Sequence, residues 1–171
     1  MTNIIQQYQR GFNTAGFLVC ACLLGFAYYL QFHEDLDPCP LCIFQRVVFI
    51  IIGLVFLAAA LHNPGKTGRR IYGVLLGITG LTGAGIAGWH TWIQHLPPDR
   101  IPECGPGLDY MLEVFPLSET LRMVFTGSGE CAEVVWTFLG LSIPEWALLC
   151  FLGLAVAGLA GNWLADDPQG A

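Results

Sequence analysis

Hydrophobic residues form four long runs along the chain, at residues 14–32, 43–61, 71–93 and 146–164. Each run has about the length of the roughly 20 apolar residues that a helix needs to cross a bilayer. None shows the alternation of apolar and polar positions that marks a strand of a membrane barrel. Because backbone groups in lipid must satisfy their own hydrogen bonds, the sequence predicts an all-α membrane protein with a four-helix transmembrane bundle. We expect residues 1–171 to form a single membrane domain.

The composition agrees with a membrane protein. Hydrophobic residues make up 54% of the 171 positions and charged residues only 12%, against about 25% charged in soluble domains. The net charge of −6 and the total of seven Lys and Arg argue against nucleic-acid binding, which depends on clustered basic side chains. The first run is longer than the apolar part of a signal peptide, and no small-residue cleavage site precedes the acidic stretch at Glu34. We therefore expect the first span to be retained.

Basic residues predict the orientation of the spans. They precede the first span and lie between the second and third, at Arg10, Lys66, Arg69 and Arg70. Such segments are typically cytoplasmic. The acidic segments 33–42 and 94–145, which hold only two Arg, are then external. With four spans, both termini are expected on the cytoplasmic side and both acidic loops on the external side.

The second external segment is too long for a simple connection, since unstructured loops above about 12–15 residues are uncommon. After Ser118, a plausible N-cap, apolar residues recur at helical spacing, at Leu117, Leu121, Val124 and Phe125. This pattern predicts a short amphipathic helix. The helix lies either on the membrane surface or against the bundle.

The seven cysteines fall into two groups. Three lie inside spans, where a thiol behaves as a small hydrophobic group, at Cys20, Cys22 and Cys150. Four lie in the external segments, at Cys39, Cys42, Cys104 and Cys131. Four external cysteines admit three pairings. Cys39 and Cys42 are close enough in sequence to pair with each other, which would leave Cys104 with Cys131.

The Cys39-Pro-Leu-Cys42 motif fits a redox pair or half of a zinc site. The flanking prolines and the membrane helix that begins at the motif favour redox chemistry, because the positive end of the helix dipole stabilises a thiolate at Cys42. A structural zinc ion bound by all four external thiols remains the alternative. It would make the protein a non-catalytic scaffold or small transporter.

Three polar residues lie at about the depth of this motif. Arg46 follows Cys42 by one helical turn, roughly 6 Å along the axis. Its guanidinium either binds the carbonyl oxygen of a cofactor and favours the thiolate, or extends to the lipid headgroups. His90 lies near the external end of the third span, where a polar side chain inside the bundle is a candidate for function. Gln45 beside Arg46 is a weaker candidate.

Two motifs resemble one known family. The run PCPLCIFQR at 38–46 resembles the first periplasmic loop and second span of the DsbB family of disulfide-bond-forming membrane proteins. The run SGECAE at 128–133, followed by WTFLGL at 136–141 and PEW at 144–146, is similar to that family's second periplasmic loop and fourth span. Cys104 and His90 stand at the expected places. The Gly- and Pro-rich stretch 102–107 departs from the family pattern.

The resemblance implies an inner-membrane oxidoreductase that reoxidises a DsbA-like periplasmic thiol oxidase and passes the electrons to ubiquinone or menaquinone. It implies that the partner attacks Cys104, that Cys131 then attacks Cys39, and that Cys42 leaves as a thiolate. It places Arg46, His90 and Gln45 at the quinone and implies no metal. A vitamin K epoxide reductase-like enzyme is a rival, although that family carries its Cys-x-x-Cys late in the chain.

Overall fold

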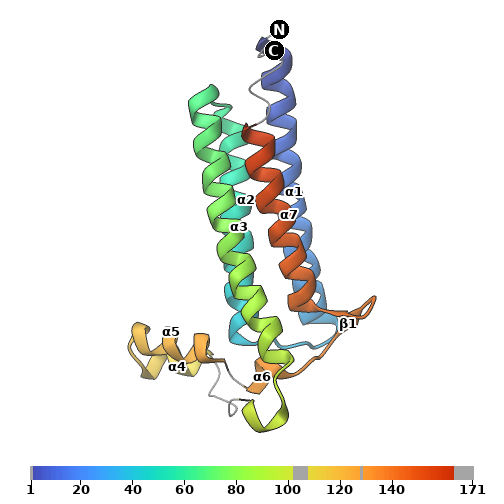
Figure 1. Ribbon diagram of the computed structural model, residues 1–171, viewed down its shortest axis with the longest axis vertical. Coiled ribbons are helices and arrows are strands. Elements are labelled where there is room, and N and C mark those ends of the chain that lie inside the picture. Colours follow the sequence, from blue (N-terminus) through green and yellow to red (C-terminus); the bar gives the residue numbers. More distant parts are fainter. Residues whose placement is uncertain (1, 102–107, 128, 164–171) are drawn as a thin grey trace.

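Four long helices run side by side in a computed structural model, which describes residues 2–101, 108–127 and 129–163 (Figure 1). They are α1 (Thr2–His33), α2 (Pro40–His62), α3 (Lys66–Gln94) and α7 (Ile143–Trp163). Each is long and apolar enough to cross a membrane. The predicted all-α transmembrane bundle is confirmed. The helices extend beyond the apolar runs, most of all in α1.

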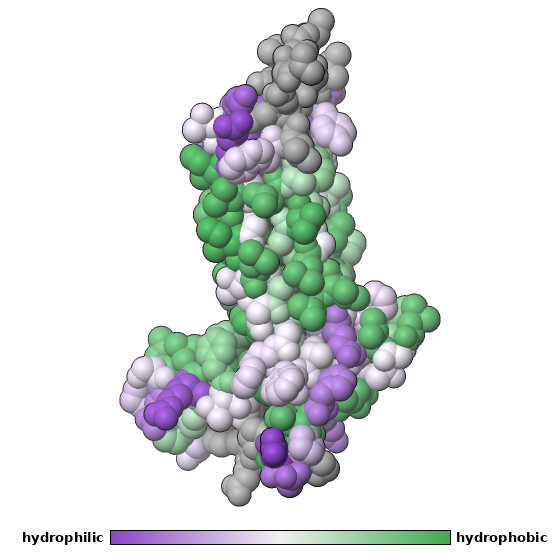
Figure 2. All heavy atoms as spheres, viewed as in Figure 1, coloured by the Kyte–Doolittle hydropathy of each residue, from purple (hydrophilic) through white to green (hydrophobic). Residues whose placement is uncertain are grey.

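The surface of the bundle is hydrophobic around its middle and hydrophilic toward its ends (Figure 2). Large apolar side chains point outward there, with Leu54, Ile78, Leu81 and Val156 each more than half exposed. A water-soluble bundle would bury such a band, whereas a bilayer solvates it. The chain is therefore a multi-pass membrane protein.

Small residues bring α3 and α7 into close contact. A Cβ atom added to Gly80 would lie 2.7 Å from the Cβ of Ala155 and 3.0 Å from its Cα. A Cβ added to Gly83 would lie 2.5 Å from the ring of Phe151. Close backbone approach through small residues is a common way to join helices in lipid, where no hydrophobic effect drives them together.

Buried amides join α1 to α7 at the end of the bundle that carries the termini. The side chains of Gln9, Asn13 and Asn162 are almost fully buried. Asn13 and Asn162 pair through their amides at 3.2 Å, and Gln9 donates to the Gly161 carbonyl at 2.9 Å. These bonds explain why α1 continues as a helix through polar residues that precede the first apolar run.

The opposite end, here called the loop end, carries the short elements of the 94–145 segment (Figure 1). They are a 3₁₀ turn (Pro98–Arg100), α4 (Leu108–Val114), α5 (Leu117–Thr126), α6 (Gly129–Ala132), β1 (Thr137–Phe138) and β2 (Leu141–Ser142). The predicted helix exists as α5. The neighbouring helices and the hairpin were not expected.

The start of α5 differs from the prediction. Its N-cap is Pro116, which makes no side-chain cap, so the assignment of Ser118 as N-cap is wrong. The carbonyl of Pro116 accepts hydrogen bonds from the Glu119 and Thr120 amides, and these bonds begin the helix two residues earlier than a Ser118 cap allows. Phe125 at the far end of α5 packs on Phe44, with ring centroids 5.9 Å apart.

A tight hairpin leads into α7. β1 and β2 pair Phe138 with Leu141, and the two turn residues Leu139 and Gly140 both have positive φ, as a two-residue hairpin turn requires. Ser142 then precedes the helix, and its amide donates to the Glu145 carboxylate at 2.6 Å. This bond is one of the two that make up a capping box, and it fixes where α7 begins.

The close approach of α3 and α7 gives a testable expectation. Gly80→Ala places a methyl against the backbone of Ala155 and should lower the stability by about 1–3 kcal/mol, as overpacking does. Gly85→Ala, in the same helix with nothing within 4 Å of the added Cβ, should change the stability by less than about 0.5 kcal/mol. Thermal unfolding in detergent compares the two, and equal melting temperatures would contradict the packing.

Candidate functional site

The Cys-x-x-Cys motif forms the first turn of α2. Cys39 is the N-cap, with extended backbone at φ −64° and ψ 163°, and Pro40 occupies the first helical position. Proline suits that position because its fixed φ is helical and its missing N–H would have no partner. Cys39 is 9% exposed and Cys42 is partly buried. Both thiols thus lie at a helix N-terminus, where the dipole favours thiolates.

His90 of α3 lies against this motif and is only 2% exposed. Its Nε2 atom is 3.7 Å from the Sγ of Cys39 and 3.1 Å from the backbone carbonyl oxygen of Cys131. Its Nδ1 atom is 3.1 Å from the side-chain nitrogen of Gln45, which is 4% exposed. With the Gln45 amide donating to Nδ1, the ring proton resides on Nε2, which donates to the Cys131 carbonyl.

Cys131 belongs to α6 and is 1% exposed. It packs in one apolar cluster with Cys39, together with Leu41, Ile93, Met111 and Val124. The structure therefore brings three predicted cysteines of two separate loops together, Cys39, Cys42 and Cys131. Cys104 lies outside the described residues.

Arg46 is held by α1 rather than extended into solvent. Its guanidinium donates to the Gln31 side-chain oxygen and, at 3.2 Å, to the Ala27 carbonyl. It also lies over the ring of Tyr28, 4.9 Å from the centroid. A guanidinium offers five N–H donors, so these contacts orient the group while leaving it able to bind a further acceptor.

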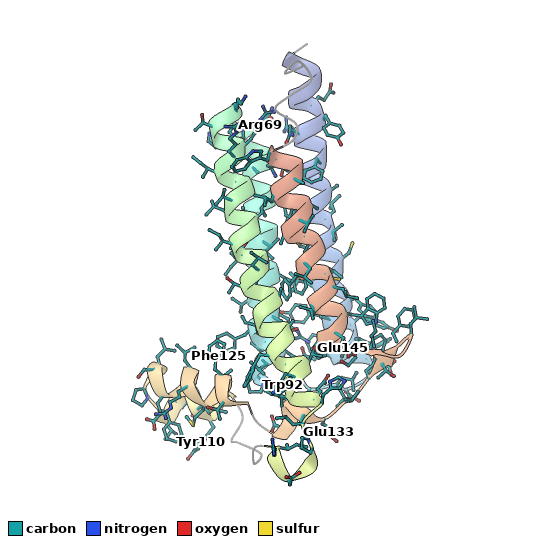
Figure 3. The ribbon with its side chains drawn as sticks, in the orientation of Figure 1. Arg69, Trp92, Tyr110, Phe125, Glu133 and Glu145 are labelled. Atoms are coloured by element: carbon teal, nitrogen blue, oxygen red, sulfur yellow. The ribbon has the colours of Figure 1, made fainter. Side chains whose placement is uncertain are left out.

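A cavity of about 650 Å³ connects these residues, a volume typical of small-molecule sites. Its polar lining includes Cys39, Cys42, Gln45, Arg46 and His90, together with Asp37, Gln94 and Glu130. The walls are otherwise mostly apolar and come from α1, α2, α7 and the hairpin. Glu133, which also lines the cavity, lies at the loop end, and Arg69 lies at the opposite end of the bundle (Figure 3).

The hairpin supplies an aromatic wall that the sequence analysis did not assign to the site. Trp136 stacks on Phe138 with centroids 6.0 Å apart, and Phe138 contacts Trp146 at 6.1 Å. All three line the cavity. The sequence did offer a signal for this wall. Trp136 and Phe138 alternate before the Leu-Gly turn, and alternate residues of an extended segment share one face.

The three cysteines within the spans lie in different environments. Cys20 is buried in the core of the bundle, and Cys22 is exposed on the outer face. Cys150 is partly buried and lines the cavity. Its place in the cavity was not anticipated from its position within the fourth run.

A family model described as "Disulfide bond formation protein DsbB" matches residues 9–161. The chain belongs to the DsbB family. This assignment confirms the resemblance and separates the chain from the vitamin K epoxide reductase type. The family takes part in disulfide bond formation, which is oxidoreductase chemistry. The four membrane-spanning helices make this chain a membrane protein of that family.

Curated relatives carry the name "Disulfide bond formation protein B". One from Hahella chejuensis is 61% identical over 137 residues, which cover 80% of this chain and 83% of the relative. One from Methylococcus capsulatus is 54% identical over 151 residues, covering 88% and 92%. One from Nitrosococcus oceani is 57% identical over 144 residues, covering 84% and 85%. The similarity thus extends over nearly the whole DsbB domain.

The Gln45–His90 contact can be measured as an energetic coupling. Gln45→Leu leaves the buried Nδ1 of His90 without its partner, whereas in the double variant with His90→Leu neither polar group remains. We expect a coupling of about 0.5–3 kcal/mol in a double-mutant cycle of unfolding. The cycle of Gln9→Leu with His90→Leu, at opposite ends of the bundle, should be additive. Additivity in both cycles would refute the contact.

Proposed function

We propose that this DsbB-family protein reoxidises a DsbA-like thiol oxidase and transfers the electrons to membrane quinone. The observation that carries the proposal is the meeting of Cys39, Cys42 and Cys131, of which Cys39 and Cys42 line a largely apolar cavity. An enzyme that moves electrons from a protein to a lipid-soluble acceptor needs both features. The proposed site lies at the loop end.

Burial supports a division of labour among the cysteines. Cys39 is 9% exposed and Cys131 is 1% exposed, so the thiol of a soluble protein has little access to either sulfur. The partner is therefore proposed to attack Cys104, which releases Cys131 as a thiolate. Cys131 then attacks Cys39, and Cys42 leaves. The second thiol of the partner then attacks the mixed disulfide and releases Cys104. Cys104 attacks Cys131 of the Cys131–Cys39 disulfide and frees Cys39. The partner then holds a new disulfide, Cys104 is again paired with Cys131, and the reduced Cys39–Cys42 pair carries the two electrons.

The cavity fits a quinone headgroup. Its volume and its apolar and aromatic walls suit a flat ring with a lipid tail, and both Cys42 and Arg46 line it. A bound quinone would supply an acceptor for two electrons and two protons from the Cys39–Cys42 pair. Arg46, oriented by its bonds to α1, would hold a carbonyl oxygen there. Gln45 would fix the ring of His90 beside the thiols. Ubiquinone and menaquinone share this chemistry.

The energetics explain why such an acceptor is needed. A structural disulfide has a potential below about −300 mV and a DsbA pair one near −120 mV. Oxidising the second with the first is therefore uphill by roughly 8 kcal/mol. A disulfide that only stabilises a fold cannot do this. Withdrawal of electrons from Cys39 and Cys42 by quinone would draw the exchange forward.

The proposed location is the bacterial inner membrane, with the loop end in the periplasm and both termini in the cytoplasm. The positive-inside rule supports this orientation. Lys66, Arg69 and Arg70 begin α3 at the end that also carries the termini. The loop end is acidic, and the periplasm is the oxidising side on which disulfides persist.

Cysteine substitutions test the relay. Serine at Cys39, Cys42, Cys104 or Cys131 should abolish steady-state oxidation of the partner, because each position is an obligatory carrier. Alanine at Cys20, Cys22 or Cys150 should leave most of the activity. The measurement is quinone reduction driven by reduced partner. Near-normal turnover of Cys104→Ser would exclude the relay.

The order of exchange is tested by trapping. In Cys131→Ser the mixed disulfide with the partner should accumulate at Cys104, since the thiol that resolves it is missing. Non-reducing electrophoresis followed by peptide mapping locates the linkage. A linkage at Cys42 would contradict the proposed order.

Arg46 is tested by separating quinone binding from thiol exchange. Arg46→Lys keeps the charge but loses the planar donors, so we expect a raised KM for quinone. Arg46→Ala should raise KM further, by about 10- to 100-fold, since it removes a charged hydrogen bond. Exchange between the partner and Cys104, measured without quinone, should remain unchanged. Normal quinone kinetics in both variants would leave Arg46 as a link to α1 only.

A further inference from the structure

Three potential metal ligands converge beside the cavity. The Sγ atoms of Cys39 and Cys42 and a ring nitrogen of His90 all lie within 4.8 Å of one another. Both cysteines are present as free thiols. Two thiolates and an imidazole are the ligand types that Zn²⁺ prefers. This set differs from a zinc site built on the four external thiols, because it uses His90 and needs neither Cys104 nor Cys131.

The separation of Cys39 and His90 matches a tetrahedral zinc site. With Zn–S near 2.3 Å and Zn–N near 2.0–2.1 Å, tetrahedral geometry separates a sulfur from a nitrogen ligand by about 3.6 Å. The Sγ of Cys39 and the Nε2 of His90 are 3.7 Å apart. The backbone is therefore already arranged so that one metal ion can reach both atoms with little movement.

Gln45 supplies the outer contact that zinc-binding histidines usually have. A ligating imidazole typically donates its second N–H to an oxygen, which fixes the ring and its tautomer. The Gln45 carboxamide lies 3.1 Å from Nδ1, and a half turn of the amide presents its oxygen there. Nε2 then carries a lone pair instead of a proton and gives up its hydrogen bond to the Cys131 carbonyl.

We propose that the reduced Cys39–Cys42 pair and His90 bind Zn²⁺, and that the site exists only in the dithiol state. Binding releases the two thiol protons and transfers no electrons. Oxidation to the Cys39–Cys42 disulfide removes two of the three ligands and expels the ion. The fourth coordination position faces the cavity and accepts water. Zn²⁺ thus holds the protein reduced. That this inhibits turnover rests on the function proposed above, whereas the binding itself does not.

The experiment measures binding directly. Quinone-free full-length protein in detergent is reduced with a phosphine, desalted without oxygen, and titrated with Zn²⁺ against a chromophoric chelator. One ion should bind per chain, and protein with Cys39 and Cys42 oxidised should bind none at this site. Equal binding by both forms would overturn the proposal.

Variants identify the ligands. Cys39→Ser, Cys42→Ser and His90→Ala should each abolish or strongly weaken binding, and Gln45→Leu should weaken it by about 10- to 100-fold, as loss of outer contacts does. The controls His33→Ala and Cys22→Ala, both exposed positions, should bind normally. Cys131→Ser should also keep the ion. Loss of zinc in Cys131→Ser, or its retention in His90→Ala, would overturn the three-ligand site.

A second readout separates this site from the proposed function. Zn²⁺ should slow quinone-dependent oxidation of reduced partner, and a chelator should restore the rate. Zinc binding without any quinone reduction would contradict the proposed function and still support the zinc site. Normal turnover that Zn²⁺ does not affect, together with no binding by the reduced protein, would remove the site and leave the function.

Discussion

The arrangement at the loop end depends on one buried imidazole. His90 contacts the thiol of Cys39 and the carbonyl of Cys131 through the same nitrogen, and thereby holds the start of α2 and the short helix α6 against α3. An imidazole nitrogen without a hydrogen-bond partner costs free energy in a low-dielectric interior, so both ring nitrogens of His90 need partners. Gln45 is the partner of the other nitrogen, Nδ1. The helices α2, α3 and α6, which are far apart in sequence, are in this way held together where Cys39, Cys42 and Cys131 lie.

The rest of the bundle leaves a cavity beside this cluster. On one side α3 and α7 approach closely through Gly80 and Gly83. On the other side Arg46 spans to α1, and the cavity opens among α1, α2, α7 and the hairpin. Since lipid provides no hydrophobic force between helices, close packing and polar bonds together set the separation of the helices.

The sequence predicted those features that lipid imposes. The apolar runs located all four spans, because a chain in hydrocarbon must be apolar and helical. They missed the first dozen residues of α1, where buried amides such as Gln9 and Asn13 bond across to α7. The position of His90 along its span predicted that it lies at about the depth of Cys42 in the membrane. Depth does not determine which side chains it contacts. Which thiol the ring contacts depends on helix rotation and on the fold of 94–145, and neither leaves a periodic signal. Cysteine spacing could not show that Cys131 is buried beside Cys39.

Glutamine is well suited to the position beside His90, because its carboxamide can either donate or accept. When it donates to Nδ1, the proton on Nε2 is available to the Cys131 carbonyl and holds α6 near Cys39. When it accepts from Nδ1, the lone pair on Nε2 faces the Cys39 thiol and can receive its proton or a metal ion. A carboxylate would favour only the second tautomer, and an apolar side chain neither. One amide rotation therefore links the position of Cys131 to the protonation of Cys39, which are the two quantities that would change in the proposed exchange between the loops.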